Sequence, residues 1–184
     1  MVMTSGRAFR VTLLLCASLL LYGSLVAGLV PMIAESAIEV LPLMEKSPDW
    51  RYVGAELWTF LALNIATCIL FFGAAIGIAR HSSFGWVLAQ AIYISAVATT
   101  LYMGLSYPKY FLGCLLAFLP FASLLLTFEV RNYFFSNGIV PMRGRIQVVA
   151  ITVAITGSWL WHTQSLLGIE SKLQAATQLQ RWAP

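Results

Sequence analysis

Charged side chains are scarce in this sequence, and their scarcity excludes most soluble folds. Only 10% of the 184 residues are Asp, Glu, Lys or Arg, whereas 60% are hydrophobic. A soluble domain carries roughly a quarter charged residues, so a water-soluble fold of this size could not cover its surface. Much of that surface must therefore face lipid. The sequence predicts an integral membrane protein, with membrane lipid as its first partner.

Motifs for catalysis and for cofactor binding are also absent. The sequence contains no GxSxG, HExxH, GxGxxG or Walker-type glycine-rich loop. No paired carboxylates fall in the middle of an apolar run, so the usual relay of an ion-coupled carrier is not visible. We therefore predict that the protein is not an enzyme and holds no cofactor.

Histidine and cysteine are too few, and too scattered, to predict a metal site or a haem. His81 and His162 fall near opposite faces of the predicted membrane, so they cannot hold one haem between them. Cys16, Cys68 and Cys114 lie inside apolar runs without CxxC spacing. Such cysteines are more often small buried side chains than ligands.

The net charge of +4 does not predict a nucleic-acid partner. Basic residues fall at the ends of apolar runs rather than in a stripe or cluster. In that position they act as topology signals.

Five apolar runs are long enough to cross a hydrocarbon core, which needs roughly 20 residues. They are Val11–Ala34, Leu57–Ala79, Phe84–Tyr107, Tyr110–Phe128 and Ile146–Ile169. The first run exceeds the core of a cleaved signal peptide, so we interpret it as a retained span. The fifth is the most polar. The predicted fold is all-α: one integral membrane domain, a polytopic transmembrane helical bundle of about five spans.

Two segments are predicted to lie outside the membrane. In residues 35–56, an external loop, we expect Pro42 to break the helix, and Ser47 and Pro48 to cap and open the next one. Residues 170–184 form an external tail whose apolar side chains recur at helical spacing. That spacing fits a helix on the membrane surface, and equally a frayed end of the fifth span.

Orientation follows from the basic residues. With the N-terminus inside, six arginines lie on the inner side against five basic residues outside. The first span decides the narrow balance, because Arg7 and Arg10 precede it and Glu35 and Glu39 follow it. The prediction is N-in and C-out, in a cell membrane that we take to be the bacterial cytoplasmic (inner) membrane.

Polar residues gather in the predicted outer half of the spans. Because a buried polar side chain is costly in hydrocarbon, they predict an outward-facing vestibule with Glu35 or Glu56 close to His162. The alternative is that they only bond their own helices or join neighbouring ones. The candidate residues are His162, Asn64, Thr99, Thr100, Gln164, Glu35 and Glu56.

Small residues recur every four positions, a spacing that lets helix backbones approach closely in lipid. Gly73 and Gly77 are the candidate packing pair, and Ala150, Ala154 and Ser158 form a second stripe. Such stripes serve contacts within the chain or contacts with another chain.

Two functions remain open. The first is a non-catalytic subunit or accessory protein of a membrane complex, with other membrane subunits or a second copy as partner. The alternative is a small transporter or ligand-binding bundle that uses the outer vestibule.

Overall fold

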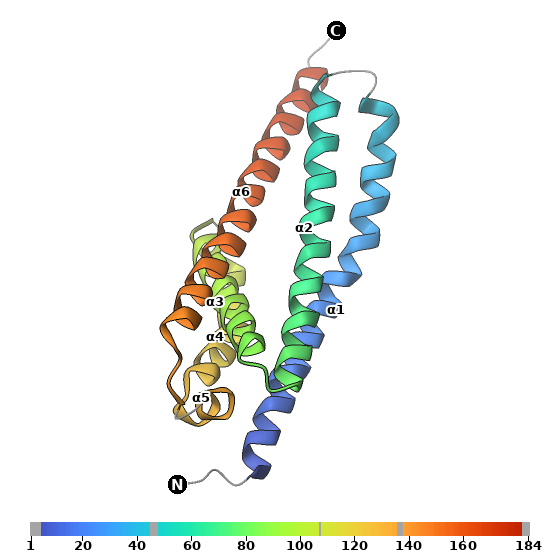
Figure 1. The fold of residues 1–184 in the computed structure, drawn as a ribbon. Helices are drawn as coiled ribbons and strands as arrows, with labels where there is room; N and C mark the ends of the chain where they lie inside the picture. Colours follow the sequence, from blue (N-terminus) through green and yellow to red (C-terminus); the bar gives the residue numbers. More distant parts are fainter. Residues whose placement is uncertain (1–4, 45–47, 107, 136–137, 182–184) are drawn as a thin grey trace.

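The computed structural model describes residues 5–44, 48–106, 108–135 and 138–181, and these residues are almost entirely helical. The all-α prediction is confirmed for the described chain. Five long helices and one short helix lie side by side (Figure 1). They are α1 (Ser5–Met44), α2 (Pro48–Ala79), α3 (Ser83–Ser106), α4 (Pro108–Leu126), α5 (Phe128–Phe134) and α6 (Met142–Arg181).

Helices α1 and α2 form a long antiparallel pair that extends beyond α3 and α4 (Figure 1). Their contact is the most extensive between any two helices of the described chain. The expectation that Pro42 breaks the first helix is wrong, since α1 continues through Pro31 and Pro42 to Met44. A proline removes one backbone hydrogen bond and bends a helix, yet α1 remains helical past both prolines.

Most of the segment expected to be an external loop is therefore helical. Helix α2 begins at Pro48, as the sequence predicts, because proline suits the first helical position. The proposed cap, Ser47, lies outside the described residues.

A tight turn joins α2 to α3. His81 has a positive φ of 54°, its backbone N–H donates to the carbonyl of Ile78, and that of Ser82 donates to the carbonyl of Gly77. These two bonds form a Schellman motif, which satisfies carbonyls left free at a helix end. The imidazole of His81 also lies 3.1 Å from the hydroxyl of Tyr133 in α5. The turn makes α2 and α3 antiparallel neighbours.

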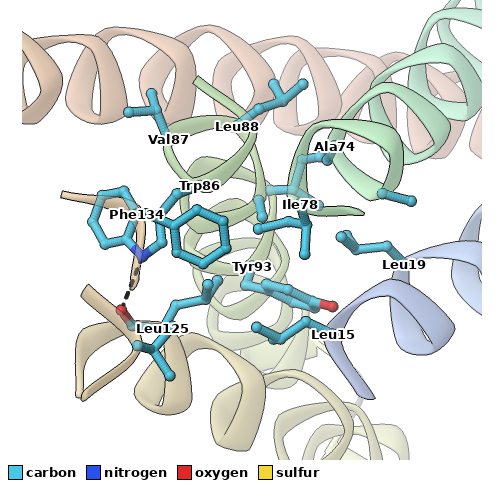
Figure 2. Close-up of a cluster of buried hydrophobic side chains, with 14 of the residues drawn as sticks. Leu15, Leu19, Ala74, Ile78, Trp86, Val87, Leu88, Tyr93, Leu125 and Phe134 are labelled. Atoms are coloured by element: carbon cyan, nitrogen blue, oxygen red, sulfur yellow. Dashed lines mark hydrogen bonds between the residues drawn. The ribbon is translucent and has the colours of Figure 1, made fainter. Parts of the chain in front are cut away.

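Helix α3 is the central helix, and the buried core surrounds its first half. Figure 2 shows Tyr93 of α3 between Leu15 and Leu19 of α1, with Ile78 of α2 beside them. Trp86 of α3 lies on the side of α4 and α5. Apolar side chains from five helices therefore meet at the predicted inner end of the bundle.

Polar atoms inside this core are joined across helices. The indole nitrogen of Trp86 donates to the carbonyl of Leu125 at 3.1 Å (Figure 2). The hydroxyls of Ser18 and Tyr93 bond each other, and Ser18 also bonds the carbonyl of Leu15. A buried polar group without a partner is costly, so these bonds fix how α1, α3 and α4 face one another.

Three described stretches are long and apolar enough to cross a membrane: Phe9–Glu39, Arg51–Ala79 and Ser83–Tyr102. Helix α4 contributes a shorter apolar stretch, Leu115–Leu126. Large apolar side chains are exposed along these helices, as expected for surfaces that contact lipid. The architecture is that of a membrane helical protein.

Helix α6 continues without interruption from Met142 to Arg181. Residues 170–181 thus extend the fifth predicted span rather than form a separate helix, and residues 182–184 lie outside the described chain. At about 1.5 Å per residue α6 is roughly 60 Å long, about twice the thickness of a hydrocarbon core.

Candidate functional site

The two candidate polar residues on α6, His162 and Gln164, contact different helices. His162 meets α2 and Gln164 meets α3. The contact with α2 at Glu56 and His162 lies toward the end that the sequence predicts to be external, where α2 begins and α6 ends. The contact with α3 runs beside the part of α6 nearer its start (Figure 1).

His162 and Glu56 form the contact with α2. The Nδ1 atom of His162 lies 3.6 Å from Oε2 of Glu56. That distance suits an ion pair with a protonated histidine but exceeds a hydrogen bond. His162 is only 2% exposed, and neither ring nitrogen has a hydrogen-bond partner among the described residues. The imidazole is therefore a buried group with unused hydrogen-bonding capacity.

An aromatic ring stacks on the histidine, and a second aromatic ring packs on the first. Phe60 stacks on His162 with ring centroids 4.6 Å apart and planes 15° from parallel. Trp159 meets Phe60 edge to face at 6.2 Å. Helical spacing explains the arrangement, since Glu56 and Phe60 are one turn apart on α2 and Trp159 and His162 are three residues apart on α6. The result is a site with an apolar wall and one carboxylate.

Asn64 lies one further turn along α2 and is buried. Its side-chain amide donates to the carbonyl of Phe60 at 2.8 Å. Asn64 therefore bonds its own helix, which is the structural alternative to a role in the vestibule.

Helix α3 holds the next candidates. Gln164 of α6 donates to the hydroxyl of Tyr102 at 2.9 Å, and Ser95 donates to the carbonyl of Thr152 at 3.3 Å. Thr99 lies one turn beyond Ser95 and is half-buried. Gln164 therefore belongs to the α3–α6 contact, which is separate from His162 and Glu56, and Thr99 lies on the same face of α3 as Ser95.

The two remaining candidates lie apart from these bonds. Thr100 is buried, but it is next to Thr99 in the sequence and so points about 100° away around α3. Glu35 is exposed on α1 and makes no ion pair or hydrogen bond within the described chain. Of the two glutamates expected near His162, Glu56 is the one that contacts it.

Sequence reasoning missed several members of these sites. Phe60, Trp159, Ser95, Thr152 and Thr156 were not candidates, because each residue type is common in spans. For Phe60, Trp159 and Ser95 the available signal was the helical register, since each lies three or four residues from a polar candidate on the same helix.

The candidate small residues differ in how closely they pack against the rest of the chain. A methyl group on Gly77 would lie 2.5 Å from the Cα atom of Gly85, whereas one on Gly73 would meet only Leu88, at 3.9 Å. The stripe on α6 makes no such contact with the described residues. Ala150, Ala154 and Ser158 are exposed, and no described atom lies within 4 Å of a methyl group placed on the neighbouring Gly157. Close packing inside the chain thus uses Gly77 and leaves the α6 stripe uncovered.

Comparison with protein-family models, with curated proteins and with solved structures finds no match.

Proposed function

We propose that this protein is a non-catalytic integral membrane subunit or accessory protein of a membrane complex. The observation that supports this function is the exposed small-residue face of α6, which consists of Ala150, Ala154, Gly157 and Ser158. Helices associate in lipid through faces on which small side chains let two backbones approach. A face of this kind without a neighbour in the described chain suits a transmembrane helix of a different subunit.

The membrane arrangement that we propose is five spans with the N-terminus in the cytoplasm. It adds α4 and α6 to the three apolar helices. In support, α1 begins at one end of the bundle and α6 ends at the other (Figure 1), as an odd number of crossings requires. The arginine balance favours this orientation, in a membrane that we take to be the bacterial inner membrane.

Gentle solubilisation from the native membrane, followed by identification of co-purifying proteins, tests the proposed function. The wild type should carry a stoichiometric membrane partner, and Gly157→Leu should lose it because the added side chain separates the two backbones. Val149→Leu is the matched control, since Val149 is exposed on α6 and already large. A wild-type protein that runs as a single chain contradicts the proposal, as does a partner retained equally by both variants.

A second candidate function is supported by the buried histidine. His162 has two unused ring nitrogens beside a carboxylate and an aromatic wall, the type of environment that binds a small polar ligand. Native mass spectrometry of the purified protein tests this candidate. A small-molecule adduct on the wild type that is lost in His162→Leu and kept in Glu35→Gln supports it. An adduct retained by His162→Leu contradicts it.

A further inference from the structure

A line of polar side chains follows the contact between α3 and α6. The two helices run in the same direction (Figure 1), and two hydrogen bonds join them: Ser95 to the carbonyl of Thr152, and Gln164 to the hydroxyl of Tyr102. These bonds are about 18 Å apart along α6 at about 1.5 Å per residue. We call the contact between them the α3–α6 seam.

The interval between the two bonds is polar as well. Thr99 is one turn beyond Ser95 on α3, and Thr156 is one turn beyond Thr152 on α6. Since both helices run in parallel from the Ser95–Thr152 bond, the next turn of each brings Thr99 and Thr156 to the same level. Hydroxyl groups thus recur at successive turns of the seam.

Two of these hydroxyls have no hydrogen-bond partner in the part of the chain that the structure describes. The side-chain oxygens of Thr152 and Thr156 are buried and make no hydrogen bond within the described chain. Elsewhere on the long helices the usual solution is present: the hydroxyls of Thr67 and Ser158 each bond the carbonyl four residues earlier, at 2.8 Å. Thr152 and Thr156 lack this bond, although a backbone carbonyl lies four residues before each of them.

A buried hydroxyl without a partner is costly in a dry, apolar interior. Native proteins satisfy such groups with protein atoms or with water that makes about three hydrogen bonds. Three hydroxyl groups of the seam are available to bind such a water molecule: those of Thr152 and Thr156 on α6 and that of Thr99 on α3. Hydroxyl groups donate and accept, so they can hold water in either orientation.

The two ends of the seam differ. At the predicted outer end, Tyr102 and Gln164 are exposed, and their polar groups are near the predicted membrane surface, where tyrosine commonly lies. On the inner side of Thr152, the seam continues into the apolar core through Val148 and Ile151. The polar line is therefore open at one end and closed at the other.

We propose that the α3–α6 seam is a hydration site within the membrane, which binds water that enters past Tyr102 and Gln164 and stops at Thr152. The packed helices leave the two hydroxyls no solvent-exposed surface, so water enters when the seam widens by the width of one molecule. The site is independent of the proposed subunit function, because it lies on the face of α6 opposite the exposed small residues. It is also separate from the His162–Glu56 contact.

Cysteine accessibility of the full-length protein in sealed vesicles tests this inference. Cys16, Cys68 and Cys114 are first replaced by serine, and Thr156→Cys is then treated with a membrane-impermeant thiosulfonate on the outer side. The cysteine thiolate attacks the thiosulfonate, forms a mixed disulfide and releases sulfinate. Because a thiolate forms in water and not in lipid, Thr156→Cys should react roughly tenfold faster than Val153→Cys, or more. Val153 is the control because it is exposed on the same helix. Equal, slow reaction of both variants overturns the proposal.

A second variant keeps the test decisive where a cysteine protein does not fold. Thr156→Val keeps the shape of the side chain and removes the hydroxyl. If water satisfies that hydroxyl, the melting temperature in detergent should not rise, because the water and its hydrogen bonds are lost together. A clear rise would show a dry hydroxyl whose removal relieves an unsatisfied group, and would overturn the proposal.

Discussion

Gly77 and Gly85 pack backbone against backbone across the turn between α2 and α3. A methyl group on Gly77 would lie 2.5 Å from the Cα atom of Gly85, closer than side-chain carbons approach a backbone. Neither neighbour can move aside, because both contacting groups are main chain. The antiparallel packing of α2 on α3 at this end therefore depends on two glycines.

Alanine at either glycine should destabilise the bundle. Gly77→Ala and Gly85→Ala must push the two helices apart, and overpacking of this kind costs about 1 to 3 kcal/mol. Gly73→Ala is the matched control on the same helix, because its methyl group would meet only Leu88 at an ordinary 3.9 Å. Thermal unfolding in detergent measures the difference. Equal melting temperatures for Gly73→Ala and Gly77→Ala would rule out the close contact.

The hydrogen bond between Ser18 and Tyr93 should respond asymmetrically to mutation. Tyr93→Phe leaves Ser18 with its second bond, to the carbonyl of Leu15, so the loss of stability should be below about 1 kcal/mol. Ser18→Ala leaves the buried Tyr93 hydroxyl without that partner and should cost more, about 1 to 3 kcal/mol. Chemical denaturation of both variants measures the two losses. The reverse order would mean that Tyr93 has another partner.

His162 and Glu56 should be energetically coupled. Each of His162→Gln and Glu56→Gln weakens the contact between α6 and α2, so the double variant should lose less than the sum of the single losses, by about 0.5 kcal/mol or more. His162→Gln alone should preserve folding, since glutamine remains polar. The control cycle pairs His162→Gln with Glu35→Gln, whose carboxylate is exposed on α1. Additive losses in both cycles would show that the 3.6 Å contact contributes nothing to stability.

Hydropathy predicted where the helices lie better than where they end. The five apolar runs fall on α1, α2, α3, α4 and α6, because a lipid-crossing helix needs an unbroken apolar length. The helices α1, α2 and α6 extend well beyond those runs. Charged turns such as the one at Glu39 remain helical when a neighbouring helix supports them, and hydropathy measures transfer into lipid rather than helix formation.

The candidate site could be predicted only in part, for a similar reason. Polarity within a span identified His162 and Thr99, since such groups are rare and costly in lipid. The division of the candidates between α2 and α3 depends on which face of α6 meets each helix, and that is set by packing far along the chain. Thr152 and Thr156 gave no signal at all, because threonine in a span usually bonds its own helix. The lack of a hydrogen-bond partner for their hydroxyls is a property of the assembled bundle, which the sequence does not show.

The number and direction of the membrane crossings is the central claim, and cysteine labelling tests it most directly. In a protein without its native cysteines, single cysteines replace Glu39 and Ser83, which are exposed at opposite ends of the long helices, and a third is appended to the C-terminus. Five spans with the N-terminus inside predict that an impermeant maleimide labels Glu39→Cys and the C-terminal cysteine in intact cells. Ser83→Cys should react only after permeabilisation. A C-terminal cysteine that labels together with Ser83→Cys, and not with Glu39→Cys, would contradict the five-span arrangement.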